Sequence, residues 1–166
     1  SGKRVLNLFC YTATATVSAA KGGANATKSV DMSKTYLRWA KRNLALNHVN
    51  GPEHQLVRAD CLEWIAACRD RYDLIYLDPP TFSNSKRMKT SFDIQRDHVQ
   101  LLTRTLELLS PDGVLIFSCN LRKFKLDKKK LSQWDVKDIT RATIPKDFQR
   151  NPHIHKAFEI RKRPIN

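Results

Sequence analysis

The clearest chemical signature in the chain is the segment Asp78-Pro79-Pro80, which directly follows the short apolar run "LIYL". The two prolines fix their φ angles and remove two backbone donors, so the segment predicts a rigid, extended turn. Its carbonyl groups are then free to accept hydrogen bonds from a planar group, and the nearby Phe82 is available to stack on a base. The segment therefore predicts a clamp for a nucleobase, although a plain turn capped by Asp78 is the alternative.

Acidic residues stand after two further apolar runs. Asp31-Met32 follows the first, where a carboxylate can accept hydrogen bonds from both hydroxyls of a ribose. Asp60-Cys61 follows the second, where a side-chain oxygen and a backbone N–H can read the edge of an adenine. Each pair also has a plainer interpretation, because Asp31 lies just before Ser33, the expected helix cap, and Asp60 can cap its own helix.

The stretch "VLNLFCYTAT", residues 5–14, has the pattern of a buried strand that runs into a tight turn and then a helix. Loops that hold a pyrophosphate contain glycines, because their backbone must turn tightly and approach the phosphates. This turn contains no glycine. The sequence therefore argues against NAD or FAD and favours a cofactor without phosphates.

Short apolar runs alternate with helical patterns, and this alternation predicts a mostly parallel sheet with helices on both faces. In such sheets ligands bind outside the carboxyl ends of the strands, where the acidic residues stand. The expected strands are residues 4–8, 28–31, 54–58, 72–77 and 114–118, and the expected helices are residues 14–21, 33–47, 62–69 and 92–109, the last ending at a Ser-Pro-Asp-Gly turn. After a basic loop at 120–130, residues 136–144 and 157–160 are expected to form a closing antiparallel pair at the sheet edge.

The chain has the length of one domain, residues 1–166, and its formal net charge of +14 is unevenly distributed. Residues 119–166 contain 14 basic and 5 acidic side chains. Such a field favours a polyanion such as nucleic acid, and a solvated basic surface without a partner is the alternative. The predicted RNA contacts at the pocket mouth are Phe82, Lys86, Arg87 and Lys89 after the fourth strand, and Arg122, Lys123, Phe124 and Lys125 after the fifth. Both Phe side chains are placed to stack on bases, and for Phe124 the open alternative is a rim aromatic that packs on its own loop.

The cysteine and histidine patterns bear on the redox state of the thiols and on metal binding. The four cysteines form no Cys-x-x-Cys pair, which favours reduced thiols in the cytosol. His153 and His155 alternate without further ligands at metal-binding spacing, so no metal is expected. The longest apolar runs are strand-sized, so no membrane span is expected and the predicted location is cytoplasmic. Because the chain begins Ser1-Gly2 and its first strand follows at once, we expect a fragment of a longer, multidomain protein.

Taken together, these motifs resemble the class I S-adenosylmethionine-dependent methyltransferases. The first loop of that class commonly reads V-L-D-L-G-C-G-T-G, so "VLNLFCYTA" has Asn7 at the acidic position and Phe9, Tyr11 and Ala13 at the three glycine positions. Phe and Tyr are typical of one branch, the bacterial ribosomal RNA methyltransferases, whereas Ala13 departs from it. Within that branch, "DPPTFSNSKRM", "FDIQRDH" and "DFQRNPHIH" are similar to the C-terminal half of bifunctional large-subunit rRNA guanine methyltransferases, which makes 7-methylguanine in 23S rRNA.

The resemblance implies a Rossmann-like fold with a seven-stranded sheet and an antiparallel closing strand, and S-adenosylmethionine as methyl donor with S-adenosylhomocysteine as product. The implied partners are 23S rRNA, or a large-subunit precursor, and further domains of the same polypeptide. The resemblance assigns Asn7, Phe9, Tyr11, Thr12 and Ala13 to the methionine part of the cofactor, Asp31 with the adjoining Met32 to the ribose, Asp60 with Cys61 to the adenine, and Asp78, Pro79 and Pro80 to the junction of methyl donor and target base.

Guanine N7 carries an accessible lone pair, so its methylation needs no base to remove a proton. Positioning is then the main requirement, which makes Asp78 and Pro79-Pro80 orienting groups and not general bases. The guanine is expected to be unpaired or flipped out of its helix.

Two alternatives stay open at this point. Cys119, in "FSCN", stands at a strand end where a related branch making 5-methylcytosine has its nucleophilic cysteine, because cytosine C5 reacts only after a thiolate adds at C6. Cys119 can equally be a small, semi-buried apolar residue. The other alternative is an RNA-binding domain without catalysis, since a left-handed backbone at Ala13 costs about 1 kcal/mol and would weaken the cofactor site.

Overall fold

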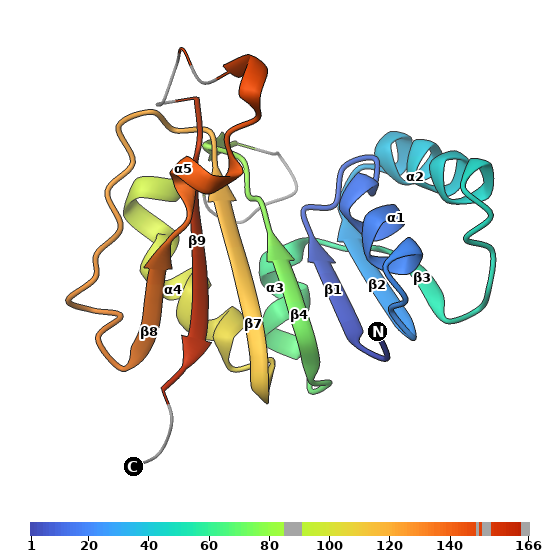
Figure 1. Ribbon diagram of the computed structural model, residues 1–166, viewed down its shortest axis with the longest axis horizontal. Helices are drawn as coiled ribbons and strands as arrows, with labels where there is room; N and C mark the ends of the chain where they lie inside the picture. The colour runs from blue at the N-terminus through green and yellow to red at the C-terminus, as the bar shows by residue number, and fades with distance from the viewer. Residues whose placement is uncertain (85–90, 149, 151–153, 164–166) are drawn as a thin grey trace.

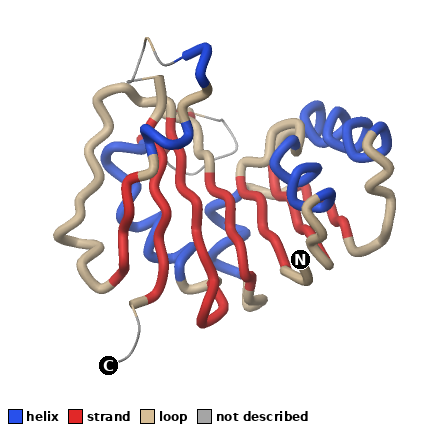
Figure 2. Tube along the Cα trace, in the orientation of Figure 1, coloured by secondary structure: helices blue, strands red, loops and turns tan. Residues whose placement is uncertain are grey.

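A computed structural model of the chain describes residues 1–84, 91–148, 150 and 154–163. A seven-stranded sheet lies between two layers of helices (Figures 1 and 2), which confirms the predicted fold class. The sheet strands are β1 (Arg4–Leu8), β2 (Ala26–Asp31), β3 (His54–Arg58), β4 (Tyr72–Leu77), β7 (Leu109–Cys119), β8 (Trp134–Asp138) and β9 (Lys156–Lys162). The helices are α1 (Thr14–Lys21), α2 (Lys34–Leu46), α3 (Cys61–Ala67), α4 (Ile94–Leu106) and α5 (Thr140–Thr143), followed by a 3-10 turn, η1 (Lys146–Phe148).

The strand order is β3-β2-β1-β4-β7-β9-β8. β1 pairs in parallel with β2 on one side and with β4 on the other, and β3 and β7 extend the parallel part. β9 runs antiparallel to both β7 and β8, as the closing strand. The chain leaves β1 toward β2 and β3 and later returns to β4, so the switch point lies between β1 and β4. Ligands of open parallel sheets bind at the carboxyl side of such a point.

One face of the sheet forms the main core. Side chains alternate along each strand, so Leu6 and Leu8 of β1 project to the same side as Ile75 and Leu77 of β4. These four leucine and isoleucine side chains are fully buried, and they belong to one cluster with Leu102 of α4. Figure 1 shows α3 and α4 behind the sheet, whereas α1 and α2 lie in front of β1, β2 and β3.

The front face is covered unevenly. Leu74 and Tyr76 of β4 and Val114 and Ile116 of β7 project to the face opposite the main core, and all four are half-buried. Among the described helices, α1 and α2 lie to one side of these strands and α5 lies near the end of β9 (Figure 1). Parallel strands are normally buried on both faces, so this apolar strip is unusual for the centre of a sheet.

Three predicted elements differ from the observed ones. Residues 92–93 form a short strand, β6 (Phe92–Asp93), which pairs with β5 (Phe82–Ser83), and α4 begins only at Ile94 because the Asp93 carboxylate caps it. The predicted turn at residues 110–113 lies inside β7, where its pairing with β4 shifts register. The predicted strand 136–144 ends at Asp138, whose Oδ1 accepts a hydrogen bond from Thr140 N at 2.9 Å and starts α5.

The expectation that Phe124 stacks on a base is wrong. Phe124 is only 4% exposed, and its ring centroid lies 5.0 Å from that of His98, 5.5 Å from that of Phe117 and 6.2 Å from that of Phe158. Burial of an aromatic ring of this size outweighs exposure beside cations, because the ring loses its contact with water. Phe124 therefore anchors the basic loop to the core.

The backbone of the same loop is held by α4. The Gln95 side-chain amide both donates to Lys125 O at 3.0 Å and accepts from Lys125 N at 2.9 Å. His98 Nε2 accepts from Asp127 N at 3.1 Å, while its Nδ1 lies 2.9 Å from Gln95 O. The loop after β7 is thus fixed at Phe124, Lys125 and Asp127, while its cations Arg122, Lys123 and Lys125 are exposed.

We expect Phe124→Ala to lower the free energy of unfolding by about 3 kcal/mol or more, because it leaves a cavity among three aromatic rings. The matched variant is Phe82→Ala, since Phe82 is 57% exposed and its loss should change the stability by less than about 0.5 kcal/mol. Urea unfolding followed by circular dichroism measures both. Equal losses for the two variants would contradict the buried position of Phe124.

Candidate active site

The turn after β1 adopts a backbone conformation that usually requires glycine. Phe9, Tyr11 and Ala13 have φ angles of 55°, 51° and 60°. A side chain in this left-handed region costs about 1–2 kcal/mol per residue. These are the three positions at which the resemblance placed glycines, so the turn keeps the glycine-type backbone shape without the glycines.

Hydrogen bonds from several elements hold the turn in this shape. Tyr11 N donates to Asp31 Oδ2 at 3.0 Å, which ties the turn to the end of β2. The remaining bonds are Phe9 N to Cys61 Sγ at 3.3 Å, Cys10 N to Val30 O at 3.1 Å, Ala13 N to Cys10 O at 2.7 Å, and Asn43 Nδ2 to Thr12 O at 2.8 Å.

Two of the predicted cofactor residues support the turn from below. Asn7 is 2% exposed, and its Nδ2 donates to Thr16 Oγ1 at 2.9 Å in the first turns of α1. Cys61 is buried as well, and its Sγ both accepts from Phe9 N and donates to Val30 O at 3.4 Å. Burial raises the pKa of the Cys61 thiol, which keeps it protonated as a donor. The Asn7 side chain is not among the described residues that line the pocket.

A cavity of about 510 Å³ opens at the carboxyl ends of β1, β2, β3 and β4. Its lining brings together most of the predicted cofactor and base residues, although they come from four separate loops. Three carboxylates face it and no Lys or Arg is among its described lining residues. Those residues are Phe9, Tyr11, Asp31, Met32, Ser33, Tyr36, Asp60, Cys61, Asp78, Pro79, Pro80, Ser83, Phe92 and Asn120.

The acidic residues at the ends of β2 and β3 also organise the local backbone. Asp31 Oδ1 accepts from Ser33 N at 2.8 Å, in addition to the bond from Tyr11. Asp60 Oδ1 accepts from Leu62 N at 2.8 Å, so the plainer interpretation of Asp60 as a helix cap is correct. Both side chains line the pocket while they do this.

Asp78 stands at the end of β4 in a partly buried position. Ser118 Oγ donates to Asp78 Oδ1 at 2.7 Å, and the Tyr76 hydroxyl lies 3.3 Å from Ser118 Oγ. Burial raises the pKa of Asp78, while the hydrogen bond from Ser118 and the positive charge of His155 oppose this rise. The Ser118 hydroxyl and His155 therefore favour the ionised form of the Asp78 carboxyl group.

The remaining side chains predicted to contact RNA are found in different settings. Phe82 is exposed on β5, and Arg122, Lys123 and Lys125 are exposed on the loop after β7. Lys86, Arg87 and Lys89 lie outside the described residues.

Cys119 does not have the features of a nucleophile. It is 0% exposed, it belongs to the main hydrophobic cluster, and burial raises the pKa of its thiol to about 11. Its neighbours Ser118 and Asn120 reach Asp78 and the pocket instead. The alternative that gave Cys119 a catalytic role is therefore not supported by its position.

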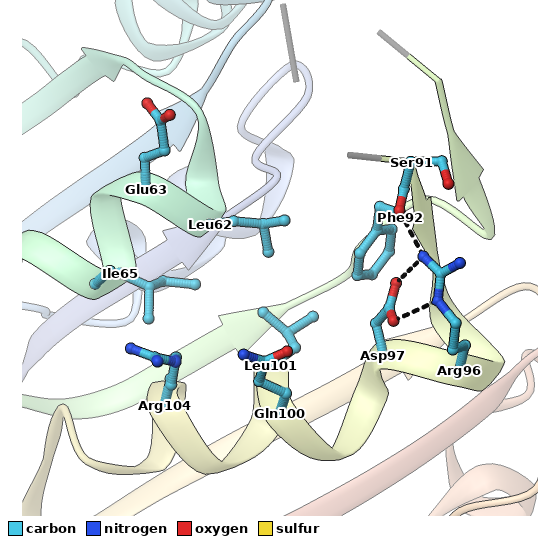
Figure 3. A pocket seen from close by; sticks show the side chains of 11 residues that line it. Leu62, Glu63, Ile65, Ser91, Phe92, Arg96, Asp97, Gln100, Leu101 and Arg104 are labelled. Carbon is cyan, nitrogen blue, oxygen red and sulfur yellow. Dashed lines mark hydrogen bonds and ion pairs between the residues drawn. The ribbon is translucent and has the colours of Figure 1, made fainter. Parts of the chain in front are cut away.

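A second cavity, of about 400 Å³, lies between α3 and α4 (Figure 3). The floor of this cavity is apolar. The guanidinium group of Arg96, which lines the cavity, forms an ion pair with Asp97 at 2.7 Å and donates a hydrogen bond to the Ser91 carbonyl. Phe92 lines both cavities and stacks on Phe9 with ring centroids 6.4 Å apart. Phe92 therefore lies between the second cavity and the one at the strand ends.

The described residues contain neither a cluster of metal-binding side chains nor a helix that could cross a membrane. No group of three or more His, Cys, Asp or Glu in that part of the chain could hold a metal ion. The helices of the same residues are too short and too polar to span a membrane.

The sequence did not predict several residues of this site, among them Tyr36, Ser118 and Asn120. Tyr36 forms an edge-to-face pair with Tyr11, with centroids 4.5 Å apart, at the rim of the pocket. Ser118 and Asn120 reach the site from the end of β7. The places of these residues in the sequence could have indicated them. Tyr36 lies in the first turn of the helix after Asp31, and residues 118–120 lie at the end of a parallel strand.

The fold and the pocket together define a class of protein. The strand order, the cavity at the switch point and the carboxylate after β2 are those of a nucleoside-binding α/β enzyme. The lining fits S-adenosylmethionine, because its sulfonium and amino groups are cations, its ribose needs an acceptor such as Asp31, and it has no phosphate that would need a positive partner.

Comparison with known proteins identifies the family. The family described as S-adenosylmethionine-dependent methyltransferase matches residues 1–132, and the chain belongs to it. The chain is 56% identical over 161 residues to ribosomal RNA large subunit methyltransferase K/L of Shewanella oneidensis and 58% identical over 161 residues to that of Allochromatium vinosum. Each alignment covers 96% of the chain and 23% or 22% of the relative, so the chain spans less than a quarter of their length. The predicted resemblance to large-subunit rRNA methyltransferases is thereby confirmed.

A solved structure agrees with this assignment. SMU.776, described as a methyltransferase in complex with S-adenosylhomocysteine, has a TM-score of 0.82 and 33% sequence identity. The match covers 96% of this chain and 45% of that one. The methyl donor of the family is S-adenosylmethionine, as predicted.

We expect Asp31→Asn to weaken the binding of S-adenosylmethionine about tenfold or more, because it removes a charged acceptor for the ribose and a bond that holds Tyr11. Asp73→Asn is the matched control, since Asp73 lies near the start of β4, at the other end of the sheet, and accepts from Ser110 Oγ. Isothermal titration calorimetry measures both. Equal affinities of Asp31→Asn and the wild type for S-adenosylmethionine would contradict the role of Asp31 as an acceptor for the ribose.

Proposed function

We propose that this chain is an S-adenosylmethionine-dependent rRNA methyltransferase domain that transfers a methyl group to N7 of a guanine in 23S rRNA. The observation that carries the proposal is an acidic pocket in a basic chain. Asp31, Asp60 and Asp78 line a cavity without a described Lys or Arg, although the net charge of the chain is +14. Such a pocket favours a cationic donor, and the basic exterior favours an anionic acceptor. The names of the Shewanella and Allochromatium relatives support rRNA as the acceptor.

The chemistry needs little from the protein beyond position and charge. In methyl transfer to N7 the S–CH3 bond breaks, the N7–CH3 bond forms, and no proton leaves. The positive charge moves from sulfur to the guanine ring. Asp78 lies beside Pro79 and Pro80 in the pocket lining, where its carboxylate can stabilise a positive charge in both states. The rigid Pro-Pro turn holds the target base in line.

The exterior of the domain supports an RNA partner. Arg122, Lys123 and Lys125 are exposed on a loop whose backbone α4 holds, and Asn120 at the start of that loop lines the pocket. Phe82, exposed on β5, is available to stack on a base next to the target. Cations on a fixed loop beside the pocket can orient a phosphate backbone toward it.

We further propose that this domain works as one part of a longer, cytoplasmic polypeptide. The relatives it matches are more than four times as long as the matched segment. The apolar strip of Leu74, Tyr76, Val114 and Ile116 is only half-buried by the described chain, and another part of such a polypeptide would complete its burial.

Incubation of 23S rRNA with the chain and methyl-labelled S-adenosylmethionine, followed by mass spectrometry of the nucleosides, tests the proposed product. We expect labelled 7-methylguanosine, and we expect Cys119→Ala to keep most of the activity because its thiol is buried and protonated. Labelled 5-methylcytidine that disappears in Cys119→Ala would overturn the proposal in favour of a C5 mechanism.

RNA affinity should depend steeply on salt, because cations that contact phosphates release condensed counterions. Replacing Arg122 and Lys123 by Gln should weaken binding and lower the slope of log K against log salt by about 1–2 units. Filter binding over a salt series measures this. The control is Lys21→Gln at the end of α1, an exposed cation far from the loop after β7, which should leave the slope unchanged. A slope that is the same in all three proteins would place the RNA elsewhere.

A further inference from the structure

Two hydroxyl groups stand in line behind Asp78 on one face of the sheet. Side chains alternate along a strand, so Tyr76 and Asp78 project to the same side, and the parallel register of β4 with β7 brings Ser118 next to them. Ser118 Oγ donates to Asp78 Oδ1 at 2.7 Å, and the Tyr76 hydroxyl lies 3.3 Å from Ser118 Oγ. Because the single proton of Ser118 is given to Asp78, the Tyr76 hydroxyl is the donor of the second bond.

We propose that Tyr76 and Ser118 form a directed hydrogen-bond chain that positions Asp78 and stabilises its carboxylate form, which makes Ser118 a positioning residue for the methyl transfer. The inference rests on the proposed function only in giving Asp78 a place beside the reacting groups. Its physical content, the coupling of Ser118 to the charge of Asp78, can be measured without any reaction.

The hydrogen-bond chain matters because burial disfavours the negative charge of Asp78, which the proposed methyl transfer requires. Burial raises the pKa of Asp78, so a carboxyl group without a donor would take up a proton more readily. A protonated Asp78 is neutral and cannot stabilise the positive charge that passes from donor to base. Donation by Ser118 lowers this pKa, and a serine whose oxygen already accepts from Tyr76 is the stronger donor.

Two further titratable groups among the described residues interact with Asp78, namely His155 and Cys119. The positive form of His155, just before β9, lowers the pKa of Asp78, and His155 Nε2 lies 2.8 Å from Thr143 Oγ1. Cys119 on β7 has a pKa of about 11 and is neutral below that pH, and Lys156 acts on this thiol. His155 is therefore the other charged partner that acts on Asp78, and a His155→Gln background removes it.

The same two strands provide a matched control. Ser110 Oγ donates to Asp73 Oδ1 at 2.8 Å, at the opposite end of β4 and β7. This pair has the same chemistry and a similar length as the Ser118–Asp78 pair, but it lies far from the pocket. Ser110→Ala thus reports the effect of losing a serine–aspartate bond between these strands without touching the site.

The direct experiment is a titration of the Asp78 carboxyl carbon by NMR in the free protein, with the His155→Gln background as a parallel series. We expect Ser118→Ala to raise the titration midpoint of Asp78 by about one pH unit. Tyr76→Phe should raise it by less, Ser118→Thr should restore it, and Ser110→Ala should leave it unchanged. The same midpoint in Ser118→Ala and wild type overturns the inference, as does an equal shift in Ser110→Ala.

A pH profile of kcat/KM connects the chain to the reaction. A folded-state pKa that rises moves the acidic limb to higher pH, so Ser118→Ala should lose activity at low pH first while its KM for S-adenosylmethionine stays near the wild-type value. If wild type makes no 7-methylguanosine, the proposed function fails and the NMR titration still decides the coupling. If wild type makes it and the acidic limb of Ser118→Ala does not move, the inference fails and the function stands. If Ser118→Ala does not fold, Tyr76→Phe provides the test. An unchanged titration midpoint of Asp78 in Tyr76→Phe would then overturn the proposed hydrogen-bond chain.

Discussion

The hydrogen bond from the Tyr11 backbone N–H to the Asp31 carboxylate is the interaction on which the pocket depends. It joins the ends of β1 and β2, while the other oxygen of Asp31 holds the residue that caps α2. The turn that it fixes contains three left-handed residues, at a cost of about 1–2 kcal/mol each. Five hydrogen bonds to the turn, each contributing about 1 kcal/mol, offset most of this cost. The strained residues Phe9 and Tyr11 thus line the pocket, and backbone strain of this kind is common in functional sites.

Two opposite electrostatic environments lie close together in this domain. Three aspartates line the pocket, and the loop after β7 carries exposed cations beside it. Charges in water are screened over about 8–10 Å, so nearby carboxylates dominate inside the pocket although the whole chain is strongly positive. In the proposed function this arrangement separates two ligands of opposite charge, a cationic methyl donor inside and a polyanion outside. Methyl transfer is then proposed to occur at the boundary, where Asp78 follows β4.

The sequence predicted those features that depend on local patterns. The alternation of apolar runs and helical patterns predicted the sheet. The acidic residues directly after these runs predicted that Asp31, Asp60 and Asp78 lie at the carboxyl ends of the strands. The features that it did not predict depend on distant contacts. Phe124 stands among cations in sequence, but its burial depends on Phe117 and Phe158, which come from two other strands. The contact of Ser118 with Asp78 depends on the register of β4 against β7, which no local pattern contains.

The central claim is that a turn without glycine, combined with an acidic pocket, accepts a cationic cofactor without phosphates. Calorimetric titration of the wild-type chain with S-adenosylmethionine, and in parallel with NAD, tests this claim most directly. We predict saturable binding of one S-adenosylmethionine per chain and no measurable binding of NAD. Binding of NAD with similar affinity, or no binding of S-adenosylmethionine even at millimolar concentration, would contradict it.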